Sequence, residues 1–87
     1  MKRPSAEPTP AHEKKLSYKE RRELDELPAR IEALEAEQRA LGETMAGAAF
    51  YRETPATIAA TLARSEGLGQ ELAALYARWD ALDSRAN

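Results

Sequence analysis

Apolar residues recur at intervals of three and four along two stretches of the chain, 24–45 and 58–82. Residues spaced 3.5 apart on average return to one side of an α-helix, so each stretch predicts a helix with one long apolar stripe. The stripe residues are Leu24, Leu27, Ile31, Leu34, Leu41 and Met45 in the first stretch, and Ile58, Leu68, Leu72, Leu75, Trp79 and Leu82 in the second. Each stripe is the natural cover for the other.

The two stripes match in length and register if the chain doubles back on itself. In an antiparallel pair, the residue numbers of any two facing residues add up to the same total. At the total that aligns the two stripes, their polar residues Gln38 and Ser65 face each other. The other expected pairs are Met45 with Ile58, Leu41 with Leu62, Ile31 with Leu72, and Leu24 with Trp79. The sequence therefore predicts an all-α fold, an antiparallel two-helix coiled-coil hairpin.

Capping signals mark where the predicted helices begin. Ser17 and Glu20 have the S-x-x-E spacing of a capping box. Thr54 and Pro55 supply an N-cap and a proline at the first helical position. We therefore expect a coiled-coil domain over 16–85, made of a helix over 17–45, a loop over 46–54 and a helix over 55–84.

Pro28 lies inside the first predicted helix, where its ring removes one backbone N–H and collides with the carbonyl of Leu24. The apolar spacing nevertheless continues through it from Leu24 to Ile31, which predicts a first helix that is kinked at Pro28 and not broken. Because Trp79 is expected opposite Leu24, we also expect its indole N–H near the carbonyl that Pro28 frees.

Residues 1–15 have a different composition from the rest of the chain. They contain Pro4, Pro8 and Pro10 among Ser, Thr, Glu and Lys, and they carry little apolar surface. Such a segment cannot offset the entropy lost on ordering, so we expect a disordered, basic, Pro-containing N-terminal tail or linker. A linker of this kind suggests a terminal module of a longer protein.

Size and composition exclude several classes of function. A two-helix rod within 87 residues has no interior for a small-molecule pocket, so we expect no enzyme. The single histidine, His12, cannot alone form a metal site, and no cofactor is expected. No apolar run reaches the ~20 residues of a membrane span, and the absence of Cys indicates a reducing compartment. We expect a cytoplasmic monomer without membrane contact.

Charge is distributed unevenly along the chain. Residues 1–22 hold seven Lys or Arg against three Glu, whereas residues 23–87 hold six Arg against twelve Asp or Glu. This asymmetry favours a polyanion at the basic end, and Lys and Arg at a helix start oppose the helix dipole, so they gain nothing structurally. A merely solvated helix surface is the alternative. The candidate nucleic-acid-binding residues are Lys14, Lys15, Lys19, Arg21 and Arg22.

Four aromatic residues allow two interpretations each. Tyr76 and Trp79 could stack on bases, but their spacing on the apolar stripe favours core packing. Phe50 and Tyr51, in the predicted loop, either cap the tip of the hairpin or contact a partner.

The runs LSYKERREL at 16–24 and LPARIEALE at 27–35 closely resemble the C-terminal domain of Uup-type ABC-F ATPases. The resemblance covers about 16–83 and departs at Gly67 and Gly69, where the family has better helix formers. Further matching residues are Phe50 and Tyr51 at the tip, Pro55 opening the return helix, and Leu75, Tyr76, Arg78 and Trp79 near its end.

The resemblance implies a parent protein with two ATP-binding cassettes that use ATP and Mg²⁺, without a membrane domain, acting on nucleic acid or the ribosome. It also implies that this domain contributes to DNA binding. The chain has no phosphate-binding glycine loop of its own. Two functions remain open: an electrostatic, largely sequence-independent DNA-binding module, or a protein-interaction arm that docks on the parent's nucleotide-binding domains, the ribosome and its rRNA, or a second copy.

Overall fold

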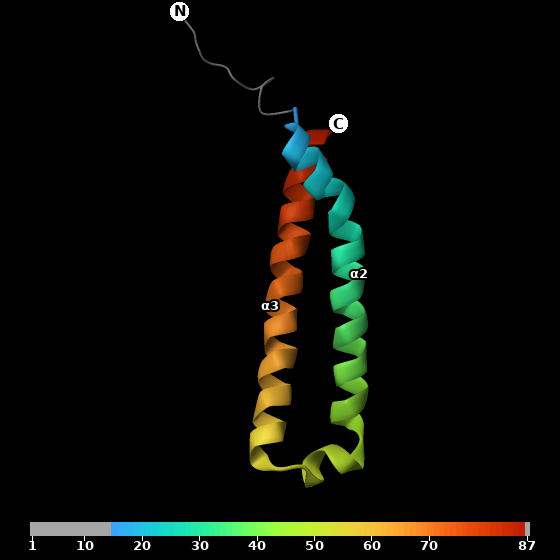
Figure 1. The fold of residues 1–87 in the computed structure, drawn as a ribbon, viewed down its shortest axis with the longest axis vertical. Helices are drawn as coiled ribbons and strands as arrows, with labels where there is room; N and C mark the ends of the chain where they lie inside the picture. Colours follow the sequence, from blue (N-terminus) through green and yellow to red (C-terminus); the bar gives the residue numbers. More distant parts are fainter. Residues whose placement is uncertain (1–14, 87) are drawn as a thin grey trace, which may run out of the picture.

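The computed structural model describes residues 15–86, which form two long antiparallel helices (Figure 1). Helix α2 spans Tyr18–Ala46, a 3-10 turn η1 spans Ala48–Arg52, and helix α3 spans Pro55–Ala86. The helices contact each other along the hairpin, and α3 extends about 48 Å at 1.5 Å per residue. The predicted all-α hairpin is confirmed. The expected disordered tail, apart from Lys15, lies outside the described residues.

Both long helices begin at side-chain caps. In α2, the backbone N–H of Glu20 donates to Ser17 Oγ at 3.1 Å, and the N–H of Ser17 donates to Glu20 Oε1 at 3.0 Å, which is the complete capping box. At the start of α3, the backbone N–H of Thr57 donates to Thr54 Oγ1 at 3.1 Å. Thr54 directly precedes Pro55, the first residue of the helix. Each cap satisfies a backbone N–H that the helix itself leaves without a partner.

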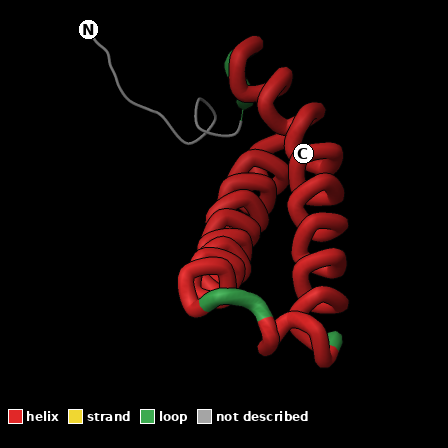
Figure 2. Tube along the Cα trace, turned by 60° about the horizontal axis from the view of Figure 1, so that its bottom comes forward, coloured by secondary structure: helices red, strands yellow, loops and turns green. Residues whose placement is uncertain are grey.

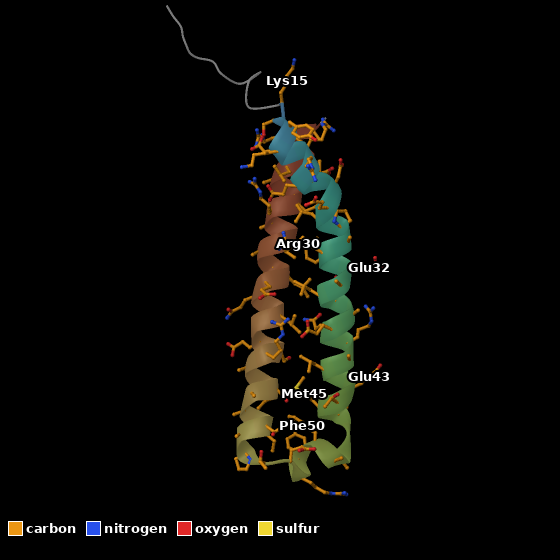
Figure 3. All side chains as sticks on the ribbon, viewed as in Figure 1. Lys15, Arg30, Glu32, Glu43, Met45 and Phe50 are labelled. Atoms are coloured by element: carbon orange, nitrogen blue, oxygen red, sulfur yellow. The ribbon has the colours of Figure 1, made fainter. Side chains whose placement is uncertain are left out.

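The connection between the helices is partly helical, because η1 occupies the middle of the loop predicted over 46–54 (Figure 2). The side chain of Phe50 is 3% exposed and lies between the ends of α2 and α3 (Figure 3). Tyr51 is 68% exposed, and its ring meets that of Phe50 edge-on with 4.9 Å between centroids. Phe50 therefore caps the tip, while Tyr51 lies outside it.

The core is a single seam between α2 and α3. Leu27, Leu68 and Leu82 have no exposed surface, and Met45 points from α2 toward α3 (Figure 3). The other buried apolar residues are Ile31 and Leu72 in the helices and Phe50 at the tip. All the buried helical residues belong to the two predicted stripes, so the hydrophobic spacing identified the inner faces correctly.

Two residues of the predicted pairing are exposed and not buried in the seam. Leu62 was expected opposite Leu41 but is 47% exposed. Counted in steps of three and four from Ile58, the next inward position is Thr61, and Thr61 is half-buried in place of Leu62. Gln38 was expected to meet Ser65 but is exposed. The helices are linked there by Arg64 and Glu37 instead, with Nε–Oε2 and Nη2–Oε1 distances of 2.7 and 2.8 Å.

Helix α2 continues through Pro28 but bends there, so that its first turns lean across the end of α3 (Figure 1). The predicted kink is thus present. The hydrogen bond expected from the Trp79 indole is not: among residues 15–86 this side chain makes none. Trp79 is 36% exposed and lies beside Pro28 and Ile31 on the outside of the seam, where water can serve the indole N–H.

Candidate nucleic-acid interface

The end of the hairpin opposite the tip, residues 15–23 and 78–86, contains most of a broad groove of about 1110 Å³, which also reaches Glu26. We call this part of the molecule the root end. The first turns of α2 form one side of the groove, and the last turns of α3 form the other. The charged residues that line the groove are Lys15, Lys19, Arg22, Arg78 and Arg85, with Glu20, Glu23 and Glu26.

The structure brings some of the predicted site residues together and separates others. Lys15, Lys19 and Arg22 line the groove and are exposed, and Lys15 projects from the end of the hairpin (Figure 3). Arg21 is also exposed but does not line the groove, because it lies about 100° around the helix from Arg22. Lys14 lies outside the described residues.

Two arginines of α3 hold the root end closed. Arg85 donates from Nη1 and Nη2 to the two carboxylate oxygens of Glu20, both at 3.1 Å, and from Nη2 to the carbonyl of Lys15 at 3.2 Å. Arg78 donates to both carboxylate oxygens of Glu23 at 2.7 and 2.9 Å. These planar two-point contacts fix the orientation of each pair as well as its distance.

Two acidic residues of the groove, Glu20 and Glu23, have lowered pKa values. The backbone N–H of Ser17, followed by the Arg85 guanidinium, lowers the pKa of Glu20 to about 2. The hydrogen bonds from Arg78 lower the pKa of Glu23 in the same way. Five cations therefore face three carboxylates in the groove. Within residues 15–86, the ammonium groups of Lys15 and Lys19 form no ion pair, so they carry the excess positive charge.

Arg22 is positioned by two weak contacts. Its Nη2 lies 3.7 Å from Glu26 Oε2, and both side chains of this pair are more than 60% exposed. Its guanidinium carbon lies 5.9 Å from the centroid of the Tyr18 ring. Exposed pairs of this kind contribute little to stability, so Arg22 can exchange Glu26 for another anion at small cost.

Sequence reasoning missed Arg78 and Arg85 as parts of the groove. A signal for them was present: they are seven residues apart, so they share a face of α3, and the antiparallel register places them opposite the basic start of α2. Charge along the sequence marks only the contiguous N-terminal run, whereas the groove is built from both ends of the domain.

A second, smaller hollow of about 380 Å³ lies beside the kink, lined by Pro28, Ile31, Glu32, Glu35, Tyr76 and Trp79. Tyr76 is 45% exposed, and its hydroxyl donates to the Glu35 carboxylate, which raises the pKa of Tyr76. The expectation that both aromatics are core residues is wrong, since about two-fifths of each is exposed. Because the aromatic surface is bordered by carboxylates, it repels phosphates.

Other kinds of site are absent from the part of the chain that the structure describes. Residues 15–86 contain no group of three or more His, Asp or Glu arranged to hold a metal ion. No helix in that range has the length and hydropathy needed to cross a bilayer.

The comparisons with known proteins agree with each other. The family model of the ABC transporter C-terminal domain matches residues 15–84. The ATP-binding protein Uup of Escherichia coli (strain K12) is 38% identical over 73 residues, which is 84% of this chain and 12% of that protein. The ATP-binding protein Uup-like of Haemophilus influenzae is 36% identical over 84% of this chain and 16% of its own length. The chain thus spans a small part of these relatives. No solved structure matches it significantly.

Proposed function

This chain belongs to the ABC transporter C-terminal domain family, and we propose that it is a nucleic-acid-binding module that holds DNA at the root end by electrostatic, largely sequence-independent contacts. The relatives confirm the resemblance to the C-terminal domain of Uup-type ATP-binding proteins, and the family model assigns residues 15–84 to this C-terminal domain. The proposed parent protein uses ATP and Mg²⁺ on its cassettes and acts in the cytoplasm.

The single observation that carries this proposal is the gathering of Lys15, Lys19 and Arg22 on one open groove with two further arginines from α3. Duplex DNA carries one negative charge per about 1.7 Å of its axis, and each phosphate that a cation neutralises releases counterions. Within residues 15–86 the ammonium groups of Lys15 and Lys19 form no ion pair, so they can reach phosphates without breaking an ion pair of the described hairpin.

The distribution of charge along the hairpin supports the same orientation. The root end holds six Lys or Arg against four Asp or Glu, whereas residues 24–77 hold four Arg against nine Asp or Glu. A polyanion is therefore attracted to the root end and repelled by the rest of the hairpin. DNA bound in this way lies across the root end and leaves the tip free.

A duplex DNA titration at two salt concentrations tests the proposal. With five phosphate contacts, from Lys14, Lys15, Lys19, Arg21 and Arg22, the slope of log K against log salt is about −4.5. We expect the triple variant Lys15→Gln, Lys19→Gln, Arg22→Gln to reduce it to about −2, because each lost contact removes about 0.9.

The matched control removes the same charge from another part of the molecule. The control is the triple variant Arg30→Gln, Arg39→Gln, Arg52→Gln. In the unmodified protein these three arginines are exposed and lie outside the groove. We expect its slope to stay near −4.5. An unchanged slope in the groove variant, or an equal decrease in the control, would show that the groove is not the DNA site.

The aromatic hollow beside the kink favours a second candidate function, a protein-interaction arm. Tyr76 and Trp79 expose apolar surface next to Pro28, and the carboxylates of Glu32 and Glu35 make this surface suitable for a partially basic protein and unsuitable for DNA. The parent's nucleotide-binding domains are the proposed partner. Calorimetric titration of these domains with the chain and with its Trp79→Ala variant tests this: equal heats would exclude the hollow as the contact.

A further inference from the structure

We infer that Tyr18 is a stacking platform for an unpaired base, so that the groove at the root end accepts single-stranded nucleic acid in addition to duplex. This inference rests on the proposed function and names a substrate class for the same groove. The ligand chemistry is a flexible phosphodiester chain with at least one base free of its neighbours.

The position of Tyr18 supports this role. Its side chain is 77% exposed, the largest exposed fraction among the large apolar side chains of residues 15–86, and it lines the groove beside Lys15 and Lys19. The guanidinium of Arg22 lies 5.9 Å from the ring centroid. An exposed aromatic ring between cations is the arrangement by which proteins hold single strands, because bases stack on the ring while phosphates meet the cations.

The backbone around Tyr18 is held in place before any ligand binds. Tyr18 is the first residue of α2 and directly follows the cap residue Ser17, which is joined to Glu20 by the capping box. Arg85 contacts both Glu20 and the carbonyl of Lys15. The segment carrying the ring is thus fixed from both sides, which lowers the entropy lost when a base stacks. Arg85 acts here as a positioning residue.

The surroundings of the other exposed aromatics are unsuitable for this role. Tyr76 and Trp79 lie next to the carboxylates of Glu32 and Glu35, which repel phosphates. Tyr51 is 68% exposed, but it lies at the tip against Phe50, far along the chain from the cationic groove. Tyr51 is therefore a matched control: a tyrosine of similar exposure without neighbouring lysines.

The test compares two ligands of equal length and charge, an oligo-dT and an abasic deoxyribose-phosphate chain. For the unmodified protein we expect the oligo-dT to bind about tenfold more tightly, since stacking is the only difference. Tyr18→Ala should remove this ratio, whereas Tyr18→Phe and Tyr51→Ala should retain it. The salt slope should be the same for all four proteins, because no charge changes. A parallel titration with an oligo-rU tests whether the groove binds single-stranded RNA or single-stranded DNA more tightly.

The outcomes separate this inference from the proposed function. A ratio of one in the unmodified protein, or an unchanged ratio in Tyr18→Ala, overturns base stacking at Tyr18, while the duplex titration with the lysine and arginine variants is unaffected. If the unmodified protein binds none of the nucleic acids, both proposals fail. Circular dichroism of each variant verifies that the hairpin is folded, and loss of helix in Tyr18→Ala is resolved by Tyr18→Phe, which preserves the ring.

Discussion

At the tip of the hairpin, α2 and α3 are joined by the chain itself, and Phe50 fills the space between their ends with 3% of its surface exposed. At the root end the chain does not connect the two helices. There Leu82 is buried between them, and Arg85 and Arg78 of α3 bind Glu20 and Glu23 of α2. The tip is closed by the connecting chain and by burial of apolar surface, whereas the root end combines one buried leucine with ion pairs between the helices.

This difference determines how each end responds to its surroundings. Apolar burial is insensitive to ionic strength, whereas exposed ion pairs weaken as salt rises and contribute little each. At high salt the root end is therefore expected to open more readily than the tip, whereas at low salt the ion pairs keep it closed. It is also the end whose groove gathers Lys15, Lys19 and Arg22, the cations proposed to bind a polyanion.

The largest expected effect comes from removing the apolar side chain that closes each end. Phe50→Ala should lower the free energy of unfolding by about 3–5 kcal/mol and Leu82→Ala by about 2–5 kcal/mol, since each leaves a cavity in a narrow seam. Urea denaturation followed by circular dichroism measures both. Tyr51→Ala is the control at the tip and should cost less than about 1.5 kcal/mol. A similarly small effect of Phe50→Ala would contradict closure of the tip by burial.

Between the two ends, α3 contains two glycines that weaken it. A Cβ added at Gly67 or Gly69 would meet no atom within 4 Å. Gly67→Ala and Gly69→Ala should therefore each raise the free energy of unfolding by about 1 kcal/mol through helix propensity. Gly47→Ala is the comparison outside the long helices, where no such gain is expected. Destabilisation by either helical substitution would mean that α3 is bent or packed differently there.

Substitutions at the two helix caps compare the local stability of the two ends. Ser17→Ala at the root end and Thr54→Ala at the tip each remove one side-chain acceptor from the start of a helix, and each should cost about 1 kcal/mol. Hydrogen exchange should show the difference: we expect faster exchange confined to the first turn of α2 for Ser17→Ala. Exchange that increases throughout both helices in that variant would argue against independent opening of the root end.

The smallest expected effect is on the stability of the hairpin at acidic pH. The folded-state pKa of Glu20 is about 2 against an ordinary value of 4.5, so the unfolded chain binds the proton more readily. The contribution of Glu20 to stability is present above about pH 4.5 and is lost as pH falls toward 2. Thermal unfolding of Glu20→Gln, which preserves the capping box, should be less pH-dependent in this window. Identical pH profiles would show that the contacts of the Glu20 carboxylate with the Ser17 N–H and the Arg85 guanidinium do not stabilise its ionised form.

Much of the fold follows from local patterns. The spacing of Leu27 and Ile31 identifies the inner face of α2, the Ser17–Glu20 box marks its start, and Pro28 marks its bend. Part of the candidate site is equally local, because residues three apart, such as Lys19 and Arg22, share a face of any α-helix. These features depend on the 3.6-residue period and on the hydrogen bonds of a single helix, so they are determined by the sequence itself.

Other features depend on how the two helices are rotated against each other. The period of α3 places Thr61 and Leu62 on adjacent faces, and only packing against α2 decides that Leu62 is exposed. In the same way, Trp79 belongs to the apolar stripe of α3 but remains 36% exposed beside Pro28. The groove requires Arg85, which is far from Lys15 in sequence and meets it only because the chain folds back. Such contacts join residues that no local pattern connects, so the tertiary structure alone determines them.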